Sequence, residues 1–406
     1  MAPRASSAAA LSLDLTDAET FVDHDPHAYF REVRRGRPVY WHEAPGPRSG
    51  FWVVAGYEDV VAAYSDADAL RSARGTVLDV LLAGDDSAGG KMLAVTDGPR
   101  HRAMRSVMWR SFTSRALEAV ARQVRSRAQR LVREVTGAGA FDFAAEVAEH
   151  IPMNTICDLL AVPEVDRGRL LGWNKKTLSA EAAGADPLDA LQARNEIVLY
   201  FMDLARERRA DPGDDVVSVL ACAKVDDEPF TLEEVALNCY SIMLGGDESS
   251  RVSAISTVRA LAEHPHQWRA LKAGQVSLDS AVEEALRWAT PAMYFARTAH
   301  HDLVLGGRHI RGGDIVTLWN ISANNDERVF HEPRSFDLAR FPNKHVAFGH
   351  GRHFCLGAHL GRIELRALLE ALMVSVGAVE QDGVPNRIHS SLLHGHSSLP
   401  VVLRAG

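Results

Sequence analysis

The sequence predicts a mainly helical fold with small β-sheets. Apolar residues recur at helical spacing over most of the 406 residues. A long helix from Thr231 to about Glu263 opens with the capping box Thr231-x-x-Glu234 and ends at a His-Pro pair. The main early strand signal is a single hairpin, 39–41 with 51–54, joined by a glycine- and proline-rich turn.

The other helices follow the same periodicity in chain order. We expect them at 28–36, 57–65, 101–112, 114–135, 277–290 and 358–376, with a broken segment over 76–90. The long helix would span about 50 Å at about 1.5 Å per residue, enough to cross the molecule. No repeat or linker divides the chain, so we expect one domain, 13–406, behind a disordered tail, 1–12.

Composition excludes several classes of protein. A hydrophobic fraction of 46% and a charged fraction of 24% suit an ordinary globular core. A net charge of −8 argues against nucleic acid as the main partner. No apolar run is long enough to cross a membrane. The four cysteines are widely spaced, which favours a reducing, cytoplasmic location over a disulfide framework.

A segment near the C-terminus, Phe-Gly-His-Gly-Arg-His-Phe-Cys-Leu-Gly, places Cys355 in a glycine-framed turn before a helix. Gly351 and Gly357 are expected to take backbone angles that other residues avoid. The start of the helix favours the thiolate form of the cysteine, as a metal ligand requires. Phe348 can pack over a flat cofactor, and His353 can point a donor at an acidic edge.

Two other interpretations of the cysteines exist. Cysteines in helical patterns are usually small buried hydrophobic residues, which is our expectation for Cys157, Cys222 and Cys239. Histidines crowd around Cys355, so a zinc site is the alternative there. These histidines are His345, His350, His353 and His359. The paired ligand spacings usual in zinc sites are lacking, which favours a single thiolate ligand.

The spacing F-G-x-G-x-H-x-C-x-G resembles the haem-binding loop of the cytochrome P450 family. The order of motifs from about Asp14 to Leu403 is similar to that of soluble bacterial members. The resemblance implies the cytochrome P450 fold, with haem b (iron protoporphyrin IX) between the long central helix and the helix after Cys355. It makes Cys355 the iron ligand of a haem-thiolate monooxygenase, which activates dioxygen with two electrons and inserts one oxygen atom into an organic substrate.

The middle of the long helix, Leu-Gly-Gly-Asp-Glu-Ser-Ser, is unusually polar. Gly245 and Ser249 share a helical face against which a planar cofactor can lie. The family carries an acid and a threonine here, which guide protons to the oxygen being activated, and Glu248 and Ser249 match that pair. Serine keeps the hydroxyl but lacks the methyl group that restricts its rotamer. The alternative is a flexible kink with solvated side chains.

Four positions match those that hold the haem propionates in the family: His101, Arg105, Arg297 and His353. His101 and Arg105 are four residues apart on one helical face. Burying two carboxylates in an acidic protein requires local cations and donors. An exposed pair would be the ordinary interpretation of His101 and Arg105 alone.

Glu284 and Arg287 form an E-x-x-R pair, which is weak evidence by itself. A later segment, Phe-Asp-Leu-Ala-Arg-Phe, is similar to the one that supplies a second arginine, Arg340, in the family. The resemblance implies a buried network with a structural role.

Three segments would line the substrate pocket by analogy, and their mainly apolar residues favour a hydrophobic small molecule. The candidates are Val77, Leu78, Leu81, Leu82, Leu244, Ala292, Met293, Tyr294, Phe295, Leu393 and His394. Each of them is also typical of a core. We expect hydroxylation or epoxidation in secondary-metabolite tailoring, with catabolic oxidation of a lipid or terpenoid as the alternative.

Nine arginines lie between Arg102 and Arg133, in an acidic chain. They predict either a solvated helix face or a docking surface for an acidic ferredoxin, to which Arg352 and Arg362 would add positive charge. A ferredoxin reductase would supply electrons to that ferredoxin.

Because Ser249 replaces threonine, haem-thiolate chemistry other than oxygenation (coupling, isomerisation or peroxide-driven reaction) stays open, as does a haem sensor or scaffold.

Overall fold

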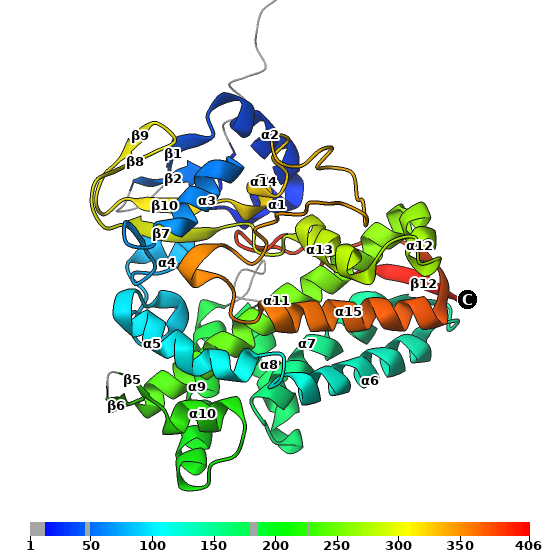
Figure 1. The fold of residues 1–406 in the computed structure, drawn as a ribbon, viewed down its shortest axis with the longest axis horizontal. Coiled ribbons are helices and arrows are strands. Elements are labelled where there is room, and N and C mark those ends of the chain that lie inside the picture. Colours follow the sequence, from blue (N-terminus) through cyan, green and yellow to red (C-terminus); the bar gives the residue numbers. More distant parts are fainter. Residues whose placement is uncertain (1–12, 45–48, 179–185, 226) are drawn as a thin grey trace, which may run out of the picture.

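The computed structural model describes residues 13–44, 49–178, 186–225 and 227–406. Helices make up most of the molecule, and the strands of its largest sheet lie together on one side of it (Figure 1). The predicted fold class, mainly helical with small sheets, is confirmed. The expected disordered tail, 1–12, lies outside the described residues.

Each predicted helix is present, with its ends within about four residues of the prediction, and further helices lie between them. The helices are α1 (Ala18–Asp23), α2 (Pro26–Gly36), α3 (Tyr57–Ser65), α4 (Leu78–Ala83), α5 (Gly98–Trp109), α6 (Glu118–Val135), α7 (His150–Leu159), α8 (Glu164–Leu178), α9 (Pro187–Ala210), α10 (Val216–Cys222), α11 (Leu232–Glu263), α12 (Pro265–Lys272), α13 (Leu278–Ala289), α14 (Asn320–Ala323) and α15 (Ala358–Ser375). In the described part of the chain, no helix is both long and apolar enough to cross a membrane.

The long helix α11 runs through the centre of the molecule, and α15 packs against it (Figure 1). The predicted capping box is present: the backbone N–H of Thr231 donates to Glu234 Oε2 at 2.8 Å, and the N–H of Glu234 donates to Thr231 Oγ1 at 3.1 Å. The helix continues through its polar middle without a break, and Asp247 and Glu248 are buried. The solvated side chains of the alternative interpretation are therefore contradicted at Asp247 and Glu248.

Gly246 explains one of the two glycines in α11. A Cβ atom at this position would overlap Ile156 Cδ1 and lie 2.9 Å from Ile156 Cγ1, so α7 can approach α11 only at a glycine. A Cβ atom at Gly245 would have no neighbour within 4 Å. One glycine thus serves helix packing, and the other leaves a face of α11 open.

The main sheet joins segments that are far apart in the sequence. Its strand order is β1 (Val39–Glu43), β2 (Gly50–Val54), β10 (Ile315–Leu318), β7 (Phe295–Ala299) and β3 (Leu70–Arg71). The predicted hairpin, β1 with β2, is confirmed by antiparallel pairing from Val39↔Val54 to Glu43↔Gly50. β10 pairs in parallel with β2 and antiparallel with β7.

The other strands form small sheets. They are β11 (Val376–Gln381), β12 (Pro400–Ala405) and β4 (Ala140–Asp142) in one sheet, β5 (Lys224–Val225) with β6 (Glu228–Pro229), and β8 (Leu303–Leu305) with β9 (Arg308–Ile310). The largest hydrophobic cluster lies among α6, α7, α11 and α15, and a second one joins α2, α4 and the main sheet around Trp319.

Candidate active site

The cysteine loop is shaped by two glycines in the left-handed region. Gly349 and Gly351 both have φ near +70°. A Cβ atom at Gly351 would overlap the carbonyl oxygen of Tyr64, so the loop lies directly on the end of α3. Gly357 has φ −82° and ψ 9°, which other residues adopt readily, so its predicted special conformation is wrong. The second left-handed glycine is Gly349 instead.

Cys355 lies immediately before α15. Its backbone N–H donates to the carbonyl oxygen of Phe348 at 2.9 Å, which closes the loop, and the thiol is half-buried. Burial raises the pKa of the Cys355 thiol, although the N–H of Gly357 and the charge of Arg105 act in the opposite direction. The start of the helix thus favours the thiolate as expected, but its effect is smaller than that of burial.

The alternative interpretations of the cysteines can be checked. Cys157 and Cys239 are buried, as expected, and burial raises the pKa of Cys157 to about 11. Cys222 is exposed, so the expectation that it is a buried hydrophobic residue is wrong. Within the described ranges, no three His, Cys, Asp or Glu side chains converge as metal ligands, which argues against the zinc alternative.

A histidine of α5 lies against a histidine of the cysteine loop. The rings of His101, on α5, and His353 lie 4.2 Å apart. His101 is 2% exposed, and its Nε2 is buried without a hydrogen-bond partner. Burial, followed by the charges of His353 and Arg105, lowers the pKa of His101 to about 4. A buried ring nitrogen that lacks a partner is expected where a ligand supplies one.

Two buried or half-buried arginines complete this group. Arg297, on β7, is 5% exposed, lies 5.4 Å over the Tyr64 ring and donates to the carbonyl oxygen of Ala296 at 2.7 Å. Arg105 donates to the carbonyl oxygen of Phe354 at 2.6 Å. Neither arginine has a carboxylate partner among the residues that the structure describes. These cations and the free His101 nitrogen fit the two carboxylates of a flat cofactor.

Asp97 is a residue of this site that sequence analysis missed. Its Oδ1 lies 3.1 Å from His353 Nε2, and its Oδ2 accepts the backbone N–H groups of Ser72 and Ala73 at 2.9 and 2.8 Å. It therefore fixes the His353 ring against the segment after β3. The available signal was its position just before the Gly-Pro start of α5.

The middle of α11 carries the candidate proton pair. Ser249 Oγ donates to the carbonyl oxygen of Gly245 at 2.8 Å. Glu248 is buried and paired with Arg251, whose Nε donates to Glu248 Oε2 at 3.1 Å. Asp247 accepts a hydrogen bond from Asn174, and burial raises the pKa of Asp247 to about 7.

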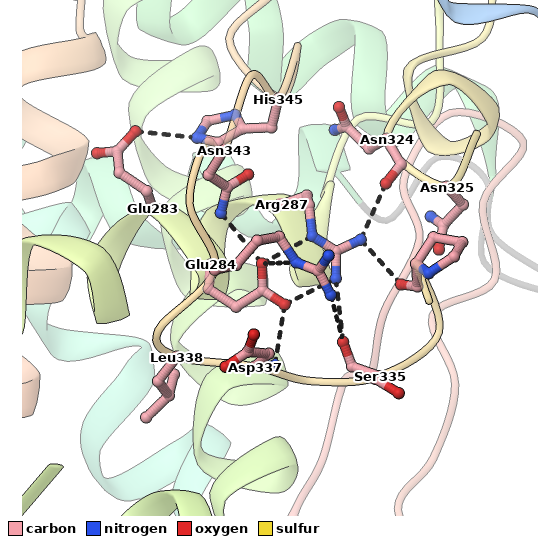
Figure 2. Close-up of polar contacts among 12 residues, drawn as sticks. Glu283, Glu284, Arg287, Asn324, Asn325, Ser335, Asp337, Leu338, Asn343 and His345 are labelled. Carbon is pink, nitrogen blue, oxygen red and sulfur yellow. Dashed lines mark hydrogen bonds and ion pairs between the residues drawn. The ribbon is translucent and has the colours of Figure 1, made fainter. Parts of the chain in front are cut away.

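Figure 2 shows the E-x-x-R network, in which Glu284 and Arg287 have no exposed surface and Arg340 is 9% exposed. Arg287 makes two hydrogen bonds to Glu284, at 2.7 and 2.8 Å, and Arg340 Nε makes a third at 3.0 Å. Asn343 Nδ2 and the backbone N–H of Asp337 each donate to Glu284 at 3.1 Å. The two arginines and the carboxylate that the motifs predicted to meet do lie in contact.

The candidate pocket residues divide into two groups. Leu78, Leu81, Met293 and Tyr294 have no exposed surface and belong to the second core, where the Tyr294 ring lies 4.8 Å from that of Trp319. They form part of the core, as the ordinary interpretation has it, and do not line an open pocket in this structure. Ala292 is almost as buried. Those with exposed surface are Val77, Leu82, Leu244, Phe295, Leu393 and His394.

Phe348 and His394 have specific neighbours. The guanidinium group of Arg362 lies 4.7 Å over the Phe348 ring, and a Cβ atom at Gly361 would lie 3.6 Å from Cε1 of that ring. Phe348 therefore packs on the start of α15. His394 meets the His27 ring edge-on at 5.3 Å, and burial lowers the pKa of His394 to about 4.

Comparison with known proteins identifies the family. The cytochrome P450 family model matches residues 276–391. Cytochrome P450 NovI of Streptomyces niveus is 42% identical over 399 residues, which cover 98% of both chains. The steroid C26-monooxygenase of Mycobacterium tuberculosis (strain ATCC 25618 / H37Rv) is 32% identical over 94% of this chain and 90% of that protein.

The fold leads to the same family. The crystal structure of P450 OxyD, which is involved in the biosynthesis of vancomycin-type antibiotics, matches with a TM-score of 0.88 and 32% identity, over 97% of this chain and 100% of OxyD. One cysteine in a glycine loop, beside arginines that form no ion pair in the described ranges, fits the site of a haem-thiolate enzyme. The chain belongs to the cytochrome P450 family and is a P450 monooxygenase, a membership that implies haem iron.

Proposed function

We propose that the cofactor is haem b, with Cys355 as its only protein ligand and His101, Arg105, Arg297 and His353 around its propionates. The support is the buried His101 nitrogen, which has no hydrogen-bond partner among the described residues, next to two arginines that form no ion pair there. When bound, such a cofactor supplies two-electron activation of dioxygen and transfer of one oxygen atom to the substrate.

Within this proposal, Glu248 and Ser249 hold and move the proton. The hydroxyl of Ser249 donates to the carbonyl oxygen of Gly245, so its lone pairs are available to accept a proton while that hydrogen bond holds its direction. Arg251 holds Glu248 in place by an ion pair. Because serine lacks the methyl group of threonine, this relay depends on the hydrogen bond to Gly245 to fix its rotamer.

The substrate in this proposal is a hydrophobic small molecule of secondary metabolism, which the enzyme hydroxylates or epoxidises. The relatives that support this are NovI and OxyD, of which OxyD is involved in antibiotic biosynthesis. The steroid C26-monooxygenase supports the second candidate, catabolic oxidation of a lipid. The four cysteines are free, which suits the cytoplasmic location that we propose.

Ferredoxin and a ferredoxin reductase are the proposed electron donors. Arg102, Arg110 and Arg115, on α5 and the turn after it, are exposed and form no ion pair in the described part of the chain. Arg352 and Arg362 are paired with Asp68 and Glu283 of the same chain, so they contribute less to this surface than expected. Exposed cations near the cysteine loop suit an acidic carrier.

The test is a reconstituted reaction with reduced nicotinamide, ferredoxin reductase, ferredoxin and labelled dioxygen. One labelled oxygen atom should enter the product, and Cys355→Ala should abolish both the reaction and the red-shifted band of the reduced carbon monoxide complex. Product that carries label from water, or a variant that keeps the band, would contradict the proposal.

Ser249 variants test the relay separately, through the product formed per reduced nicotinamide consumed. Ser249→Ala should release more peroxide and less product, and Ser249→Thr should match or exceed the parent. Equal coupling in all three proteins would refute the role of Ser249.

A further inference from the structure

A half-open cleft of about 380 Å³ lies between α2 and the segment 325–335. It shares no residue with the candidate cofactor site. Three arginines line it: Arg31 and Arg34, one helical turn apart on α2, and Arg334 from the opposite side. Glu327 and Glu332 are the acidic residues of the lining.

The arginines of this cleft form few direct ion pairs, although the charges of Asp25 and Glu263 also act on Arg334. Arg31 and Arg34 share one carboxylate, Glu327, at 3.4 and 3.0 Å. Arg334 lies 5.0 Å over the Trp288 ring, and its polar contact is a long hydrogen bond of 3.4 Å to Asn325 Oδ1. In the ranges that the structure describes, Arg334 forms no ion pair.

A neighbouring histidine reports the same local field. His27, also in the lining, has a buried Nδ1 without a hydrogen-bond partner. Burial, followed by the charges of Arg334, His394 and Arg34, holds the pKa of His27 well below its usual range. After burial, the charges of Arg334 and Arg34 thus also disfavour an additional positive charge at this histidine.

We propose that this cleft binds a small oxyanion, through a carboxylate or phosphate group held by Arg334 and Arg31. A guanidinium group offers two parallel donors that match either group, and the guanidinium group of Arg334 lies over the Trp288 ring. Arg31 is 56% exposed and can turn from Glu327 toward the ligand. Arg34 is committed to Glu327 and Ser322.

Occupancy of the cleft should stabilise the cofactor-bound fold. The cleft-lining residues Pro333 and Ser335 also accept hydrogen bonds from the Glu284 network: Pro333 O from Arg287 at 2.9 Å, and Ser335 O from Arg340 at 2.9 Å (Figure 2). An anion on Arg334 would fix this segment from its other side. The proposed ligand is thus coupled, through this segment, to the buried Glu284 network.

The experiment titrates the haem-loaded protein with inorganic phosphate and, separately, with citrate, at constant ionic strength in a chloride background. Calorimetry and the thermal unfolding of the haem-loaded state are measured. At least one anion should saturate and raise the unfolding temperature. Phosphate alone would identify a phosphate site, and citrate alone a carboxylate site.

Two variants and a control locate the site. Arg334→Met, which keeps an apolar chain on Trp288, should weaken binding by at least about tenfold, and Arg31→Gln should weaken it less. Arg404→Gln, in an exposed pair with Glu380, should change nothing. If neither anion saturates, the proposal is overturned. It is also overturned if the affinity for the anion is unchanged in Arg31→Gln and, provided that this variant folds, in Arg334→Met.

Discussion

Replacing Glu284 with glutamine tests the buried network most directly, because the shape is kept and the charge is lost. Glu284 accepts five hydrogen bonds, three of them from the guanidinium groups of Arg287 and Arg340. Hydrogen bonds to charged groups contribute about 1.5–3 kcal/mol each and are not additive. Removing one partner of a buried ion pair costs about 3–5 kcal/mol.

We therefore expect Glu284→Gln to lower the free energy of unfolding by about 3–5 kcal/mol, a large fraction of the usual 5–15 kcal/mol of a domain. Arg340→Met should cost less, about 1.5–3 kcal/mol, because Glu284 keeps both hydrogen bonds from Arg287. Arg287→Met should resemble Glu284→Gln, since Arg287 has no exposed surface and the carboxylate would lose its closest partner.

The assay is urea unfolding of the haem-loaded protein, followed by far-ultraviolet circular dichroism and by the Soret absorption band. Arg404→Gln is the matched control, because its ion pair with Glu380 is exposed and should contribute less than about 1 kcal/mol. A Glu284→Gln protein within about 1 kcal/mol of the parent would refute the reasoning. If that variant does not fold, the reasoning is refuted equally when Arg340→Met loses no more free energy of unfolding than the Arg404→Gln control.

Three further predictions follow from single contacts. Gly246→Ala should destabilise the protein by about 1–2 kcal/mol in urea unfolding, because overpacking against Ile156 exceeds the gain in helix propensity. This loss should disappear when Ile156→Ala is also present, whereas purely additive losses in the double variant would contradict the prediction. Burial alone would raise the pKa of Glu283, but hydrogen bonds from Arg362 and a histidine lower it to about 2. This carboxylate therefore stabilises the fold above its ordinary pKa of 4.5, and the contribution is lost as the pH falls toward 2. Between pH 4.5 and 2, Glu283→Gln should accordingly lose less stability in urea unfolding than the parent protein. If the stability of the two proteins changes in parallel over this pH range, the prediction is wrong. His101→Phe should speed haem transfer to apomyoglobin without changing substrate preference, and unchanged transfer would place His101 outside the propionate site.

The cysteine loop shows how far local sequence reaches. Its glycines, Cys355 and the following helix were predictable because a turn depends on residues within a few positions. Which glycines are strained was predicted only in part: Gly351 has a positive φ, but Gly349 and not Gly357 is its companion. That choice depends on the contact of the loop with Tyr64, almost 290 positions earlier in the chain.

The candidate pocket shows where sequence patterns stop. An apolar residue in a pocket wall and one in a core have the same hydrophobicity, so Met293 and Tyr294 could not be told from pocket residues until their packing on Trp319 was seen. The same holds for Cys222, whose helical pattern did not reveal that it is exposed. Asp97 was missed because its partners, His353 and the segment after β3, meet it only in the fold.

The sequence by itself determined the helical class, the long capped helix α11 and the motifs of a haem-thiolate enzyme, because periodicity, capping and turn chemistry act over short stretches of chain. The tertiary structure decided how β2, β7 and β10 pair, which charges are neutralised and which stay without a partner. Neutralisation requires two groups to meet within a few ångströms, and spacing along the chain does not specify that distance. Arg297 and Arg334 have the same charge in the sequence as Arg362, and only the fold shows that Arg362 has a carboxylate partner.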